Sequence, residues 1–204
     1  SEYFTLNSIN ASIGYKWFET KTTQWTVKPI FMNILHLSNI SPTFQARMDS
    51  IPAIRNSYQE TFIEGEGLEF IINREGINPY KYAWVKLGFE ESGLLMNGIK
   101  KLYDLGNPNN NMRFSEYLRF DFDARQYFTN SKSKLALRFY GGVGIPYGNS
   151  EVLPYIKQYF VGGAYSIRGW RPRALGPGSY YNQQVNQSRD RLFIDQAGDI
   201  KLEV

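Results

Sequence analysis

The chain has 204 residues, no cysteine and one histidine, and its formal net charge is +4. This length allows one domain with a sizeable core, the lack of cysteine excludes disulfides and thiolate metal sites, and the small positive charge gives no argument for a nucleic-acid partner. Aromatic residues make up 16% of the chain, yet the mean hydropathy is −0.42. Such a composition suits a β-sandwich or a membrane β-barrel, because barrel strands alternate apolar and polar residues.

Alternating patterns predict strands along the first half of the chain, near residues 9–17, 24–37, 68–73 and 82–89. The second of these loses its clear alternation around Pro29, which indicates a bulge or an edge irregularity. Short helical pieces are expected near residues 42–54 and 92–102. No run of about 18 apolar residues occurs, so no transmembrane helix is expected.

The clearest strand covers residues 112–128, and a short turn joins it to another at 134–145. Side chains two residues apart share one face of a strand. In the first strand, Leu118 and Ala124 therefore belong to an apolar face. Its opposite face is charged and carries Arg119, Asp121, Asp123 and Arg125. The pair is predicted to form a hairpin.

Short and long connections alternate strictly between the predicted strands. This alternation is typical of an outer-membrane barrel, with tight periplasmic turns and large outer loops. A further strand begins at residue 199, which makes seven strands. Bacterial single-chain barrels have an even number of strands and must close, so the sequence is expected to be a piece of a longer protein.

The longest connection, residues 146–198, contains the sequence GGAYSIRGW. The residues that define this motif are Gly162, Gly163, Ser166, Ile167, Arg168, Gly169 and Trp170. The paired glycines favour a tightly folded segment, and a buried arginine could fix such a loop through its guanidinium group. The motif resembles the GG-x3-[VI]-R-G-[FYW] segment of the BamA/TamA superfamily of outer-membrane assembly proteins, also called bacterial surface antigens. Residues 171–178 and 195–199 resemble the TamA-like branch most.

The resemblance implies an all-β fold, a transmembrane antiparallel β-barrel of sixteen strands preceded by POTRA repeats. All 204 residues would belong to that C-terminal barrel. They would supply about seven strands, six to eleven and the start of twelve, together with the sixth outer loop, which folds back into the lumen. The POTRA repeats and the closing strands would be absent from these residues.

The resemblance also implies a role for Arg168, the arginine of the loop motif. It is expected to pair with an acidic residue of the inner barrel wall. Glu203 faces the lumen by its position in the last strand, and Asp121 and Asp123 are lumen-facing alternatives. A buried arginine pair of this kind fixes geometry more than it adds stability.

The function implied is insertion or export of other proteins at the bacterial outer membrane. The partners would be substrate outer-membrane or surface proteins, outer-membrane lipid, and periplasmic or lipoprotein accessory subunits. No cofactor, metal or covalent chemistry is expected. A two-partner-type secretion pore for one dedicated protein and a passive porin-like channel remain alternatives. A barrel enzyme using His36, or an acid–base pair of Asp121 and Asp123, is the least favoured.

Overall fold

The computed structural model describes residues 4–50, 55, 61–104, 114–164, 166–173, 175 and 197–204. Its main element is a seven-stranded antiparallel sheet in the order β1-β2-β3-β4-β5-β6-β9. These strands are β1 Thr5–Phe18, β2 Thr23–Ser38, β3 Thr61–Asn73, β4 Lys81–Ser92, β5 Tyr117–Thr129, β6 Lys134–Pro146 and β9 Ile200–Glu203. All seven predicted strands are confirmed, and so is the all-β class.

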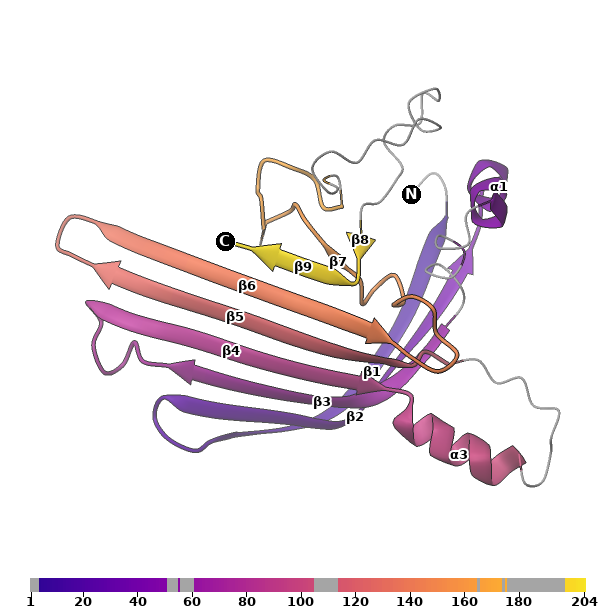
Figure 1. Cartoon of the computed structure of the whole chain (residues 1–204), viewed down its shortest axis with the longest axis horizontal. Coiled ribbons are helices and arrows are strands. Elements are labelled where there is room, and N and C mark those ends of the chain that lie inside the picture. The colour runs from indigo at the N-terminus through magenta and orange to yellow at the C-terminus, as the bar shows by residue number, and fades with distance from the viewer. Residues whose placement is uncertain are drawn as a thin grey trace.

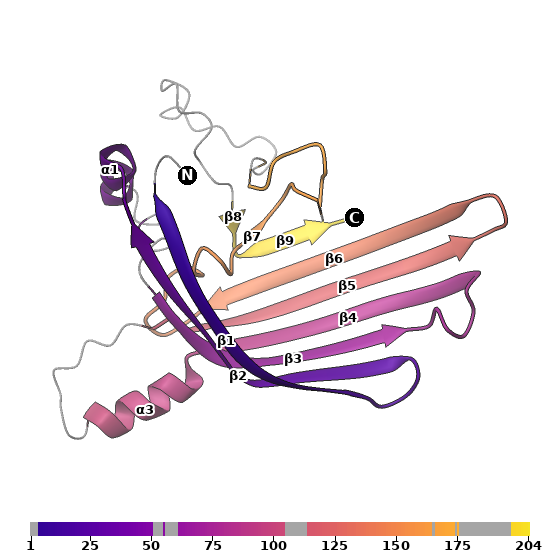
Figure 2. The same ribbon diagram turned by 180° about the vertical axis from the view of Figure 1, so that it is seen from behind.

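The sheet forms a curved wall. Tyr159 and the motif, in the described part of the long connection between β6 and β9, lie on the concave side of this wall, and the same connection includes the two-stranded ladder of β7 Tyr159–Phe160 and β8 Ala197–Gly198 (Figure 1). The reverse view shows β1 and β2 curving around the same side (Figure 2). The predicted irregularity near Pro29 is confirmed, because the β2–β3 register shifts between Lys28 and Phe31.

The connections also follow the prediction. The turns after β1, β3 and β5 are short, whereas helix α1 (Pro42–Ser50) follows β2 and helix α3 (Leu94–Asp104) follows β4. Both helices fall where short helical pieces were expected. Among the described residues, no helix combines the length and the apolar character needed to cross a membrane.

Strand β5 begins later than predicted. Residues 112 and 113 lie outside the described part of the chain, and pairing with β4 starts at Tyr117, opposite Ser92. Phe114 instead makes an isolated bridge with Phe62. Strand β4 ends at Ser92. Residues 114–116, which precede Tyr117, therefore have no partner in β4 and pack beyond its end.

The largest buried cluster lies between the concave face and the long connection. It contains Phe31, Leu35, Ile63, Tyr117 and Leu153. Four of these residues come from the sheet, and Leu153 comes from the connection, so the core holds the loop and the wall together. A second cluster, of Leu37, Phe44 and Met48, seats α1 on β2.

Candidate functional site: a loop seated on the concave wall

The glycine-rich motif forms a compact reversal. Gly162 and Gly163 have φ angles of 96° and 90°, which L side chains rarely adopt. Gly163 N–H donates to the Trp170 carbonyl at 2.8 Å, and a Cβ atom on Gly162 would lie 2.3 Å from the Arg171 carbonyl oxygen. The predicted tight fold is therefore confirmed, and both glycines are needed for it. Tyr165 lies outside the described residues.

Tyr159 anchors the loop to the wall. Its side chain is 5% exposed, and its hydroxyl donates to the Phe120 carbonyl at 3.1 Å and accepts from Arg119 Nε at 2.9 Å. The Arg119 guanidinium also lies 4.5 Å from the centre of the Tyr159 ring, a cation–π arrangement. A Cβ atom on Gly142 of β6 would lie 2.5 Å from this ring. Glycine at 142 thus makes the space that Tyr159 fills.

Leu153 makes a second close contact with β6. It is fully buried, and a Cβ atom on Gly144 would lie 2.4 Å from its Cδ2 atom. Gly142 and Gly144 are two residues apart, so both face the loop. Their missing side chains form the shallow seat into which the loop packs.

Lys157 adds an electrostatic contact. Its ammonium group pairs with Glu90 of β4 at 2.5 Å, and Tyr117 donates its hydroxyl hydrogen to the same carboxylate. The ammonium also lies 4.5 Å from the centre of the Phe31 ring. Burial lowers the pKa of Lys157, and the Glu90 carboxylate opposes part of that shift. The contact joins the loop to the middle of the sheet.

The motif itself reaches the wall through Ser166. Its hydroxyl donates to Glu203 Oε2 at 2.7 Å, and Lys201 Nζ lies 2.8 Å from the same oxygen. Arg138 Nη1 pairs with Glu203 Oε1 at 3.3 Å. Glu203 therefore faces the loop as its strand position predicted, and it joins the motif to β6 and β9.

The predicted acidic residues of β5 belong to ion pairs of the wall. Asp123 Oδ2 accepts from Arg125 Nη2 at 2.8 Å and from Arg138 Nη2 at 2.9 Å. Asp121 Oδ1 pairs with Arg119 at 3.3 Å and accepts from the Tyr140 hydroxyl at 2.5 Å. On the concave face, acidic and basic side chains thus form a network of ion pairs.

Arg168 occupies a different place from the one expected. Its side chain is exposed, and its Nε atom donates to the Ala164 carbonyl at 3.3 Å. Glu203, Asp121 and Asp123 have the partners given above, so none of the three pairs with Arg168 in this structure. Ser166, two residues earlier, makes the contact with the wall because the reversal turns it toward β9. An acidic partner for Arg168 stays a prediction.

The other motif residues contribute shape. Ile167 and Trp170 are 46% and 54% exposed, and a Cβ atom on Gly169 would have no neighbour within 4 Å. Among the described motif residues, Ser166 contacts the wall and the two leading glycines have backbone angles that require glycine.

Several anchors were not found from the sequence: Leu153, Lys157, Tyr159, Glu90 and Arg173. Arg173 donates to the Tyr155 carbonyl at 3.0 Å, and its guanidinium lies 3.9 Å from the centre of the Tyr155 ring. The glycines at 141, 142 and 144 were the available signal, because a glycine within a strand often marks the close approach of another segment.

A cavity of about 610 Å³, with charged residues of both signs in its lining, remains on the concave side. Its lining includes Lys28, Glu69, Lys86, Asp121 and Lys157. Within the part of the chain that the structure describes, no group of three or more His, Cys, Asp or Glu side chains is arranged to hold a metal ion.

Residues 106–197 match the family model of the Omp85 superfamily domain. The match covers less than half of the chain, and it includes β5, β6 and the glycine-rich motif. No curated protein matches the chain. The domain match supports the resemblance to the superfamily of outer-membrane barrels that insert or secrete proteins, to which the BamA and TamA proteins belong. It does not distinguish among branches of that superfamily.

Proposed function

We propose that this chain is part of the barrel wall, with its lumenal loop, of a TamA-like outer-membrane protein that inserts or exports other proteins. Its substrates would be outer-membrane or surface proteins, assisted by periplasmic or lipoprotein subunits. The free energy comes from folding of the substrate and its burial in the membrane, and no step is covalent.

One observation carries the proposal: a loop with the superfamily motif is seated on a charged concave wall. Ser166 contacts Glu203, while Tyr159 fills the space above Gly142. A loop fastened at both its beginning and its motif would hold the wall in one shape. A passive channel has no need of such a fastening.

The test is a double variant of the full-length protein, Tyr159→Phe with Ser166→Ala, in cells depleted of the wild-type copy. The matched control, Tyr80→Phe with Ser131→Ala, removes the same groups from the short turns. Outer-membrane and surface proteins are quantified by mass spectrometry. We expect a broad fall in the double variant alone, with the variant barrel still present in the membrane. An unchanged profile would overturn the role of the loop and favour a passive channel.

A dedicated secretion pore is the second candidate. It is favoured by the cavity of about 610 Å³ on the concave side of the wall, whose lining includes charges of both signs. In the same experiment, loss of a single exported protein would select this function over general assembly.

A further inference from the structure

Helix α3 has its polarity reversed relative to an ordinary surface helix. On the side toward the sheet, Asn97 donates its amide hydrogen to Glu116. At the start of the helix, the backbone N–H of Leu94 donates to Glu91 Oε1 at 3.1 Å. On the side away from the sheet, Leu94, Leu95 and Ile99 are 66%, 43% and 52% exposed. A helix surrounded by water places its apolar stripe against the protein body. The outer side of α3 therefore needs an apolar environment.

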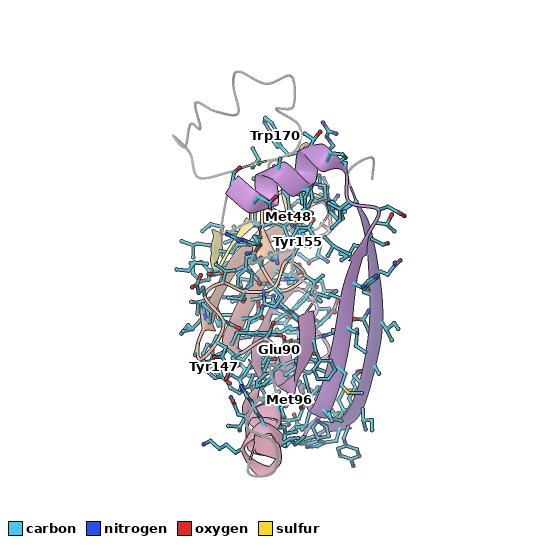
Figure 3. The ribbon with its side chains drawn as sticks, turned by 90° about the vertical axis from the view of Figure 1, so that its right-hand side faces the viewer. Met48, Glu90, Met96, Tyr147, Tyr155 and Trp170 are labelled. Atoms are coloured by element: carbon cyan, nitrogen blue, oxygen red, sulfur yellow. The ribbon has the colours of Figure 1, made fainter. Side chains whose placement is uncertain are left out.

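The helix lies on the convex side of the wall. Glu91 and Glu116 alternate with Glu90 and Tyr117, which face the loop. Figure 1 shows α3 projecting from the end of the sheet, and Figure 3 shows Met96 of α3 and Trp170 of the motif at opposite ends of the view. Within the described residues, only the start of the long connection comes near the helix, where Tyr147 donates to Glu91 and Asn149 N–H donates to Glu116. The convex face beside it carries Phe89 and Phe120, 36% and 43% exposed. The sheet thus also presents exposed apolar side chains on its convex face.

The helix also carries positive charge and no acidic residue in its first turn. Lys100 and Lys101 lie in its second half, Lys101 is exposed, and Lys100 is partly so. Apolar side chains beside lysines characterise helices that lie in the headgroup region of a membrane, where lysines approach anionic phosphates.

We propose that α3 is an interfacial helix that lies among the phosphate groups of the outer leaflet. Its apolar side, Leu94, Leu95 and Ile99, enters the boundary with the acyl chains, and Lys100 and Lys101 bind lipid phosphates. This inference rests on the proposed placement of the barrel in the outer membrane. It assigns the connection between β4 and β5 a lipid-binding role that the loop site does not include.

Nitroxide labels on the full-length protein, in a background with no other cysteine, test this proposal. The probe is Gly98→Cys and the water control is Gly76→Cys, since a Cβ atom at either glycine meets nothing within 4 Å. The lipid control is Leu87→Cys on the convex face. The protein is placed in vesicles of phosphatidylcholine with phosphatidylglycerol, and collision with oxygen is compared with collision with a water-soluble nickel chelate.

We expect the oxygen-to-nickel ratio at Gly98→Cys to lie between those of the two controls. A ratio equal to that of Gly76→Cys, with Leu87→Cys in lipid, would overturn the helix proposal and leave the membrane placement standing. If the Leu87→Cys label also meets water, the proposed function fails with it. Shielding of the Gly98→Cys label from both reagents would indicate a protein partner and overturn the lipid assignment.

The lysines are tested by Lys100→Gln with Lys101→Gln in the labelled protein. Each lysine near an anionic membrane surface raises the equilibrium constant for membrane binding by about fivefold. The ratio is therefore expected to fall in vesicles that contain phosphatidylglycerol and to stay constant in phosphatidylcholine alone. Equal ratios in all four combinations would contradict phosphate binding by these lysines.

Discussion

The two faces of the sheet are built from alternating residues of the same strands, yet their chemistry is opposite. The concave face carries paired charges, and the convex face carries apolar side chains. On the concave face, Asp121 and Asp123 are held by arginines and a tyrosine. On the convex face, Leu87, Phe120 and Phe139 are 45%, 43% and 42% exposed. The loop covers part of the charged face, whereas the apolar side chains of the other face are exposed. Alternation alone does not say which face is the inside; the position of the loop does.

The largest change in stability is expected when a charge is placed on the exposed apolar face. Leu87→Arg is expected to lower the free energy of unfolding in lipid vesicles by about 2–4 kcal/mol, because a charged side chain facing lipid is costly. Asn10→Arg, on the concave side, is the control and should change it little. Urea unfolding measures both. Equal effects would show that the convex face does not meet lipid.

The next effect tests the glycine seat of the concave face. Gly142→Val forces a side chain against the Tyr159 ring, whereas a Cβ atom on Gly141 comes no closer than 3.9 Å to another residue. Overpacking costs about 1–3 kcal/mol, so Gly142→Val should destabilise the protein and expose the loop to protease. Gly141→Val should do neither. Matching cleavage patterns for the two variants would rule out the seat.

A smaller effect isolates the Tyr159 hydroxyl. Tyr159→Phe keeps the ring over Gly142 and removes the contacts with Arg119 and the Phe120 carbonyl. The loss is expected to be about 1–2 kcal/mol, seen as faster hydrogen exchange in the segment around β7. Tyr80→Phe changes a 70% exposed tyrosine and should leave exchange unaltered. Unchanged exchange in Tyr159→Phe would mean that shape alone holds the loop.

The smallest effect concerns Asp199. Unlike Asp121 and Asp123 on the concave face, it has a buried carboxyl oxygen that is not paired with a described residue. Its Oδ1 atom is buried without a hydrogen-bond partner among the described residues, and burial raises the pKa of its carboxyl above the ordinary 3.8, opposed by the Leu153 N–H. A raised pKa in the folded state means that stability is lost as pH rises through it. Asp199→Asn should therefore stabilise the protein at neutral pH by about 1 kcal/mol or less.

Urea unfolding at several pH values measures this variant. The difference from the wild type should disappear below pH 3.8, where Asp199 is protonated in both states. A constant difference across this range would show that the carboxyl is not the cause.

Most of the sheet could be predicted from the sequence, because the alternation of apolar and polar residues indicates both the strands and their two faces. The charged face of β5 and the inward position of Glu203 were predicted correctly on that basis. Alternation cannot reveal contacts between distant segments, so the pairing of Lys157 with Glu90 and the packing of Leu153 on Gly144 were missed. Arg168 shows the same limit: a motif identifies a loop, whereas the backbone reversal decides that Ser166 is the residue facing Glu203.

Gly142 and Gly144 also affect the entropic cost of closing the connection between β6 and β9. Strands β6 and β9 share only the pairs from Tyr140–Glu203 to Val143–Ile200, yet a very long connection must close before they can meet. Each halving of a free loop lowers its closure cost by about 0.6 kcal/mol. Gly142 and Gly144 let Leu153 and Tyr159 pack on β6, so once these contacts have formed, fewer residues lie between the fixed points that loop closure must join. The two missing side chains are therefore expected to lower the entropic cost of pairing β9 with β6 as well as to seat the loop.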